Sequence, residues 1–96
     1  MPTVTRAENR QARRLARARA REAADRLTAR EIEFLQALVD EGSVKLAAHA
    51  QRVREQTLKN ALANMRAKVG VESNEQLTLV CSHRLRVPTG TVPTYP

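Results

Sequence analysis

The strongest constraint on the fold lies in residues 53–71, VREQTLKNALANMRAKVGV. Four apolar residues recur there at spacings that place them on one face of an α-helix. They are Leu58, Leu62, Met65 and Val69. Gly70 then supplies the residue without a Cβ that a left-handed helix end prefers. We therefore expect a short turn and one helix, about residues 57–69, that buries this face and ends at Gly70.

The opposite face of this helix carries small and hydrogen-bonding side chains. It consists of Lys59, Asn60, Ala63, Asn64 and Ala67, with Arg66 and Lys68 at its flanks. Such a face is suited to a flat, negatively charged surface.

Three segments of the chain resemble the DNA-binding domain of the LuxR/GerE family of bacterial transcription regulators. They are LTAREIEFL (27–35), EQTLKNALANMRAKVGV (55–71) and SNEQL (73–77), and they align without a gap over residues 27–80. The resemblance implies an all-α, four-helix domain whose second and third helices form a helix-turn-helix. The sequence predicts that an Arg- and Ala-rich helix precedes this domain.

The expected organisation has three parts. Residues 1–26 form a basic helix or arm, residues 27–86 form the helix-turn-helix domain, and residues 87–96, which contain three prolines, form an extended tail.

The charge balance of the chain indicates a polyanionic partner. The formal net charge is +7 and the sequence pI is about 11.0, which favours nucleic acid or an anionic membrane surface. Single strands are usually bound by stacking bases on several aromatic rings, and membrane-surface helices use bulky apolar residues. Phe34 and Tyr95 are the only aromatic residues, so we expect double-stranded DNA as the partner and no membrane association.

Metal and cofactor chemistry is not expected. The soft metal ligands are His49, Cys81 and His83, whereas a structural zinc site needs four ligands at suitable spacing. Neither a phosphate-cradling glycine loop nor a nucleophile with a matching base is recognisable, so we expect no cofactor and no enzyme. The single cysteine, and the lack of a signal-type apolar run, predict the cytoplasm of a bacterium or of a phage-infected bacterial cell.

Capping residues mark the remaining helices. Thr28 with Glu31, and Ser73 with Gln76, form capping boxes, and Ser43 caps a short helix between them. The resemblance implies that Glu31 also fastens its helix to the rest of the domain, although capping alone would explain this residue nearly as well.

The turn before residue 55 departs from the family pattern. Gln51 stands where a core Leu is usual, Arg52 where Gly is usual, and Arg54 where a cap residue is usual. A left-handed backbone is costly for Arg52, so we expect a turn that is one residue longer or differently shaped.

Residues 3–26 concentrate the basic charge. They hold eight arginines against three acids, a balance of +5 out of the total of +7. We expect a helix that is frayed or partner-dependent at its N-terminal end and that contacts DNA phosphates through Arg13, Arg14, Arg17 and Arg21. A solvated helix or disordered tail, and a protein partner gripping this helix, remain alternatives.

The family resemblance also assigns roles on DNA. It implies that Lys59, Asn60 and Ala63 face bases in the major groove. It also implies that the DNA backbone is contacted by Arg54, Gln56, Thr57, Asn64 and Lys68, and we add Arg52 and Arg66 to this set. Neutralising about six phosphates would give a slope of log affinity against log salt near −5.

The last helix, about residues 74–84, offers two interpretations. The resemblance implies that Leu77, Val80, Cys81 and Arg84 form a homodimer contact on DNA, whereas Leu77 and Val80 could instead complete the core of one copy. The main alternative function is a protein-interaction module that engages the transcription machinery through a helix-turn-helix scaffold. Duplex RNA binding is a third hypothesis that charge alone allows.

Overall fold

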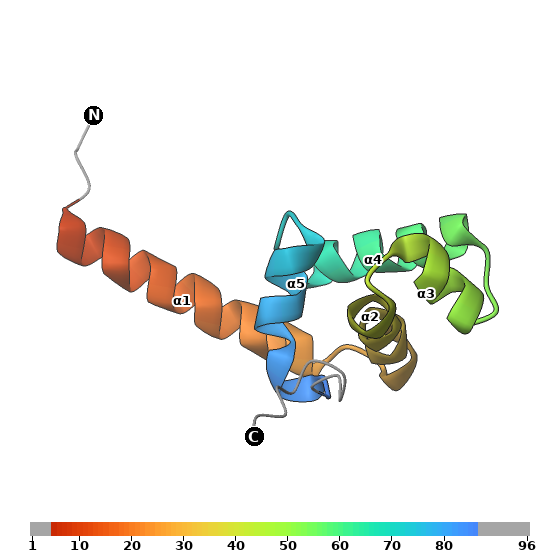
Figure 1. Cartoon of the computed structure of the whole chain (residues 1–96). Coiled ribbons are helices and arrows are strands. Elements are labelled where there is room, and N and C mark those ends of the chain that lie inside the picture. The colour runs from red at the N-terminus through yellow and green to blue at the C-terminus, as the bar shows by residue number, and fades with distance from the viewer. Residues whose placement is uncertain (1–4, 87–96) are drawn as a thin grey trace, which may run out of the picture.

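The computed structural model describes residues 5–86, which form five α-helices and one short 3-10 helix (Figure 1). In chain order these are α1 (Arg6–Asp25), α2 (Ala29–Glu41), α3 (Val44–Ala50), α4 (Glu55–Val69), α5 (Asn74–Val80) and η1 (Ser82–Arg84). The described part contains no strand, so the all-α prediction is confirmed. The predicted tail, residues 87–96, lies outside the described residues, as do residues 1–4 of the predicted arm.

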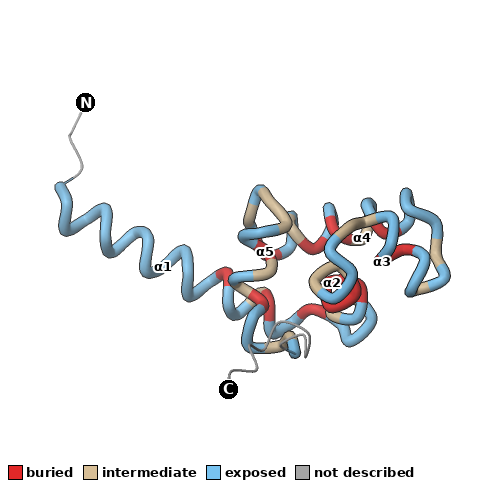
Figure 2. The backbone as a smooth tube through the Cα atoms, in the orientation of Figure 1, coloured by how far each residue is buried: buried red, intermediate tan, exposed pale blue. Residues whose placement is uncertain are grey.

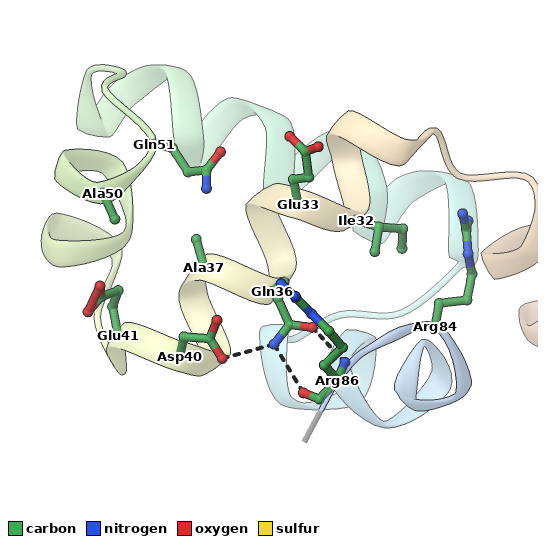
Figure 3. Close-up of a pocket in the computed structure, with 10 residues that line it drawn as sticks. All are labelled: Ile32, Glu33, Gln36, Ala37, Asp40, Glu41, Ala50, Gln51, Arg84 and Arg86. Atoms are coloured by element: carbon green, nitrogen blue, oxygen red, sulfur yellow. Dashed lines mark hydrogen bonds between the residues drawn. The ribbon is translucent and has the colours of Figure 1, made fainter. Parts of the chain in front are cut away.

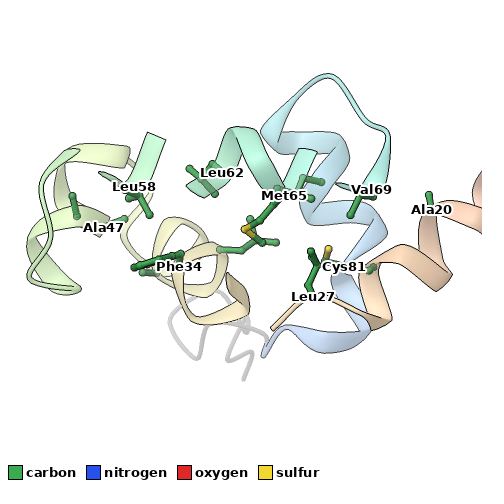
Figure 4. Packing of buried hydrophobic residues seen from close by; sticks show 14 residues of the cluster. Ala20, Leu27, Phe34, Ala47, Leu58, Leu62, Met65, Val69 and Cys81 are labelled. Carbon is green, nitrogen blue, oxygen red and sulfur yellow. The ribbon is translucent and has the colours of Figure 1, made fainter. Parts of the chain in front are cut away.

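The predicted apolar face of α4 lies at the centre of the core. Leu58 and Met65 have no exposed surface, Leu62 is 1% exposed and Val69 is 5% exposed. These side chains contribute to one cluster that includes Phe34 of α2, Ala47 of α3 and Cys81 after α5 (Figure 4). Because each buried Leu or Met stabilises the fold by about 1.5–3 kcal/mol, this face fixes the orientation of α4.

The predicted helix ends are largely confirmed. Thr28 and Ser73 accept a hydrogen bond from the backbone of Glu31 and Gln76, whose side chains accept one in return. Gly70 is left-handed, with φ of +81°. The α4 helix begins at Glu55 rather than residue 57, although Arg54 makes no side-chain capping bond.

The turn between α3 and α4 corrects the expectation of a longer or differently shaped turn. Arg52 adopts the left-handed conformation itself, with φ of +58°, and among residues 5–86 it is the only residue other than glycine with positive φ. The backbone N–H groups of Arg52 and Val53 donate to His49 and Ala48 carbonyls at 3.1 and 3.0 Å. The turn therefore keeps a geometry that favours Gly, at a cost in strain.

The basic N-terminal segment forms one continuous helix from Arg6 to Asp25. Thr5 and Glu8 form a capping box that the sequence analysis missed, and this box supports the first turn of α1. The first half of α1 projects away from the other helices and is exposed (Figures 1 and 2).

The C-terminal end of α1 belongs to the core of the domain. Ala20 is 9% exposed and Ala24 has no exposed surface, and both lie in the same apolar cluster as α4 and α5. The predicted boundary at residue 26 is therefore corrected. The change from core to projecting arm occurs inside α1, near Ala20.

Replacing Arg52 by Gly should stabilise the protein. A left-handed residue other than Gly costs of order 1 kcal/mol or more, whereas Gly loses roughly 0.5–1 kcal/mol of backbone entropy on folding. We expect a net gain of up to about 1 kcal/mol in the free energy of unfolding, measured by urea denaturation.

The matched control is Arg54→Gly, which removes the same charge from the same turn. Arg54 has φ of −73° and is the N-cap residue of α4, so glycine relieves no strain there. Because Gly is well tolerated at an N-cap, this control should change stability by only about a few tenths of a kcal/mol. An Arg52→Gly variant that is no more stable than the control would contradict the strain at Arg52.

Candidate nucleic-acid interface

The predicted base-contacting residues stand together on the outer side of α4. Lys59, Asn60 and Ala63 are exposed; Asn60 and Ala63 project from the side of the helix opposite its buried apolar face, and Lys59 lies at the edge of that side. The amide of Gln56 donates to Oδ1 of Asn60 at 2.9 Å, which holds both side chains along the helix surface. The surface formed by these residues, which we call the α4 outer face, presents one cation and two amides.

Further polar groups surround the N-terminal half of α4. Arg52, Arg54, Gln56, Thr57 and Asn64 are all exposed. Arg54 provides no side-chain cap, so N–H groups of the first turn remain available to an acceptor. Two guanidinium groups beside a helix N-terminus make an arrangement that favours an anion such as phosphate.

Arg66 and Lys68 differ from the other predicted phosphate ligands because they have partners within the protein. The Arg66 guanidinium donates to Oδ1 of Asn74 at 2.5 Å, at the start of α5. Lys68 Nζ lies 2.8 Å from Oε2 of Glu31, at the start of α2. These contacts brace the two flanks of α4, and a phosphate would have to compete for both cations.

Glu31 combines the two roles that the sequence analysis considered for it. One oxygen caps α2 by accepting from the Thr28 N–H at 2.9 Å, and the other accepts from Lys68. Partial burial raises the pKa of Glu31, but the hydrogen bonds from Lys68 and Thr28 outweigh it and hold the pKa below its ordinary value. Glu31 therefore joins α2 to the C-terminal half of α4 while it is ionised.

The predicted dimer contact is corrected in three of its four residues. Leu77 and Cys81 have no exposed surface, and burial raises the pKa of the Cys81 thiol. Arg84 is held within the protein, because its guanidinium donates to the carbonyls of Ala24 and Leu27 at 2.9 and 2.5 Å. Leu77 and Cys81 complete the core of one copy, and Arg84 caps the end of α1.

The exposed apolar residue of α5 is Leu79, which the sequence analysis missed. Its exposed fraction is 74%, and half-buried Val80 lies beside it. A helical projection could have found it, because a residue two positions from buried Leu77 lies on the opposite side of a helix.

The predicted arm arginines form part of a longer row on α1. Arg13, Arg14, Arg17 and Arg21 are all exposed, and at 100° per residue they lie on one side of the helix. Arg6 and Arg10, which the sequence analysis did not single out, lie on the same side. Helical periodicity over the whole segment would have found them.

A separate hollow of about 360 Å³ lies on the other side of α2, between α2, α3 and the segment after η1 (Figure 3). The amide of Gln36 holds that segment by donating to the Arg86 carbonyl and accepting from the Arg86 N–H, at 3.1 and 2.7 Å. Glu33, Asp40 and Glu41 line the hollow together with Arg84 and Arg86. Three carboxylates against two guanidinium groups do not make a positive surface for a polyanion, so we do not include the hollow in the candidate interface.

Residues 5–86 contain neither a metal-ligand cluster nor a membrane-spanning helix. No group of three or more His, Cys, Asp or Glu side chains within this range is arranged to hold a metal ion. No helix in the same range is long and apolar enough to span a bilayer.

Comparison with known proteins identifies the domain that carries the α4 outer face. Residues 25–81 match the GerE family, described as bacterial regulatory proteins of the luxR family. The matched range runs from the end of α1 to the residue after α5 and includes both helices of the helix-turn-helix, α3 and α4. Neither the curated proteins nor the solved structures gave a match.

Replacing Glu31 by Gln should remove a pH-dependent contribution to the free energy of unfolding, which comes from the charged contact with Lys68. The side-chain amide introduced by Glu31→Gln can still accept from the Thr28 N–H, but it carries no charge. We expect a loss of about 0.5–1 kcal/mol in the free energy of unfolding at pH 7, because Lys68 is 56% exposed and the pair is partly screened.

The sign of the pH dependence follows from the lowered pKa of Glu31. The contact stabilises the fold above the unfolded-state pKa of Glu, about 4.3, and is lost as the pH falls through the lower folded-state pKa. Urea denaturation should therefore show wild type and Glu31→Gln converging between about pH 5 and pH 3. Glu33→Gln, at a 58% exposed position, is the control. A constant difference between wild type and Glu31→Gln across this range would argue against the charged contact.

Proposed function

Because the chain belongs to the luxR family of bacterial regulatory proteins, we propose that it is a sequence-specific transcriptional regulator that inserts α4 in the major groove of double-stranded DNA. The helix-turn-helix domain of this family binds DNA. The observation that carries the finer proposal is the α4 outer face, whose side chains stand clear of the core on a helix that the core holds rigidly.

The outer face of α4 has the groups that distinguish base pairs in the major groove. Lys59 can donate to guanine O6 or N7, and the Asn60 amide can form two hydrogen bonds with adenine N6 and N7. Asn60 must first give up the bond from Gln56, which is then free to turn toward the DNA backbone. Ala63 offers a methyl group that fits beside the methyl of thymine. Few long side chains reach the bases, so modest sequence discrimination is expected.

Phosphate contacts would hold α4 in register on the duplex. Arg52, Arg54 and Thr57 lie around the uncapped N-terminus of α4, where charge and free N–H groups favour phosphate. Asn64 is exposed farther along the helix. Arg66 and Lys68 would join these contacts only by exchanging Asn74 and Glu31 for phosphate.

We propose that the protein binds DNA as a homodimer, because a single domain of this size offers few DNA contacts. Two linked copies read two half-sites and gain affinity through effective concentration. Leu79 and Val80 of α5 offer an apolar surface for a symmetric contact between copies. The complex would act in the cytoplasm of a bacterial cell.

Single substitutions on the α4 outer face test base recognition. The best-bound duplex is first selected from a random DNA library, and its affinity is compared with that of a shuffled duplex of equal composition. Lys59→Ala and Asn60→Ala should each lower the preference for the selected duplex by about 1–3 kcal/mol. Glu72→Ala, at an exposed position outside α4, is the control.

The same experiment separates the proposed function from a protein-interaction module on a helix-turn-helix scaffold. A module of that kind would tolerate both substitutions and would show no preferred duplex. That result would contradict a base-reading role for α4.

Replacing Leu79 by Gln tests the dimer contact. Leu79→Gln should shift the protein toward the monomer in sedimentation experiments with DNA, because a symmetric interface loses the apolar side chain twice. The matched control is Leu15→Gln, since Leu15 on α1 is also exposed, at 56%. An equal shift in both variants, or no shift in either, would contradict a contact centred on Leu79.

A further inference from the structure

The projecting helix α1 carries one side made entirely of arginine. At 100° per residue, Arg6, Arg10, Arg13, Arg14, Arg17 and Arg21 fall within an arc of about 100° around the helix axis. Between Arg6 and Arg21 no other residue type falls in this arc. All six residues are exposed, and we call this surface the arginine stripe.

Within residues 5–86 the stripe arginines form no ion pair, because the ion pairs in this range involve Arg30, Lys68 and His83. Among the three acids of α1, Glu8 and Glu22 lie outside the arc of the stripe, and Asp25 contacts His83 at 2.6 Å. Like charges three and four residues apart each destabilise a helix by roughly 0.2–0.5 kcal/mol, so the stripe is a repulsive arrangement that a polyanion would relieve.

The C-terminal part of the stripe lies beside the C-terminal end of α4, the proposed recognition helix. Ala16 and Arg17 line one hollow together with Gly70 and Glu72, which follow α4 directly. From there α1 leads outward, away from α2 and α3 (Figure 1). The stripe from Arg6 to Arg21 spans about 22 Å, which is the axial length of about six base pairs at 3.4 Å each.

We propose that the arginine stripe is a second DNA-binding surface, which contacts the phosphate backbone of duplex DNA beside the site occupied by α4. This inference rests on the proposed function, because the stripe starts beside the C-terminal end of α4, the helix proposed to lie on the duplex. Arginines with no interleaved apolar or hydrogen-bonding side chains match phosphates and carry little information about bases.

The composition of the stripe favours DNA over a protein partner. The centre of a protein interface is depleted of charge and buries apolar or aromatic side chains, and the stripe has neither. The exposed Leu15 lies on the opposite side of α1, so a partner that buried this leucine would leave the stripe in solvent.

Two double variants with equal loss of charge test the stripe. Arg10→Ala/Arg13→Ala removes two stripe residues far from α5. Arg19→Ala/Arg26→Ala removes two exposed arginines outside the stripe, Arg19 on the opposite side of α1 and Arg26 at its C-cap. Because alanine is the best helix former, circular dichroism of the free proteins should show no loss of helix in either variant.

Affinity for a labelled 30-base-pair duplex of mixed sequence is measured by fluorescence anisotropy between 50 and 300 mM KCl. The slope of log affinity against log salt should become shallower by about 2 in the stripe variant, at roughly 0.9 per lost phosphate contact, with affinity at 150 mM lowered roughly tenfold or more. The Arg19→Ala/Arg26→Ala variant should keep the wild-type slope to within about 0.5.

The possible failures point to different parts of the account. Equal losses in the two double variants would overturn the stripe as a binding surface while leaving base recognition by α4 intact, since the Lys59→Ala effect on sequence preference does not depend on α1. Loss of binding to polyglutamate but not to the duplex in the stripe variant would assign the stripe to an acidic protein and overturn the inference. Failure of the wild type to bind the duplex would overturn the stripe and the proposed function together.

Discussion

The burial of one side of α4 is the interaction on which the rest of the structure depends. Leu58, Leu62, Met65 and Val69 insert into a core that includes residues from every other α-helix. A helix held in this way cannot turn about its axis without exposing its apolar side chains, at about 1.5–3 kcal/mol for each one. The position of the outer face is therefore set by the core rather than by the residues of that face.

Two contacts at the flanks of α4 reinforce this arrangement. Arg66 ties one flank to Asn74 at the start of α5, and Lys68 ties the other flank to Glu31 at the start of α2. The same two cations are among the residues predicted to contact DNA phosphates. In the free protein they hold the helix in place. If they contacted phosphate instead, the contacts with Asn74 and Glu31 would be lost and contacts with DNA would be gained.

Local patterns in the sequence predicted the parts of the fold that local physics determines. The apolar side of α4, its end at Gly70 and the capping boxes at Thr28 and Ser73 each depend on residues within one or two turns of each other. The partner of Lys68 is 37 positions away, and no local pattern indicates it. The residues predicted to face DNA do lie on the exposed side of α4, whereas their contacts with bases stay predictions.

The incorrect predictions share a physical cause. Each was made from the type of a residue, without knowledge of the residues that contact it in the folded protein. Arg52 was expected to change the turn, but the hydrogen bonds of the turn and the packing on either side of it impose a left-handed backbone on arginine. Ala20 and Ala24 are too small to signal a buried side of α1 from the sequence. Cys81 was assigned to a partner, and Leu77 either to a partner or to the core, because the exposure of α5 depends on where α1 ends; both residues are buried.

The most direct measurement of the central claim is methylation interference with dimethyl sulfate on the duplex selected from a random library. This reagent modifies guanine N7 in the major groove and adenine N3 in the minor groove, so one experiment examines both grooves. If α4 lies in the major groove, duplexes methylated at guanine N7 within the site should be depleted from the bound fraction, at positions that repeat in each half-site. Depletion confined to adenine N3 would place the protein in the minor groove and contradict the account.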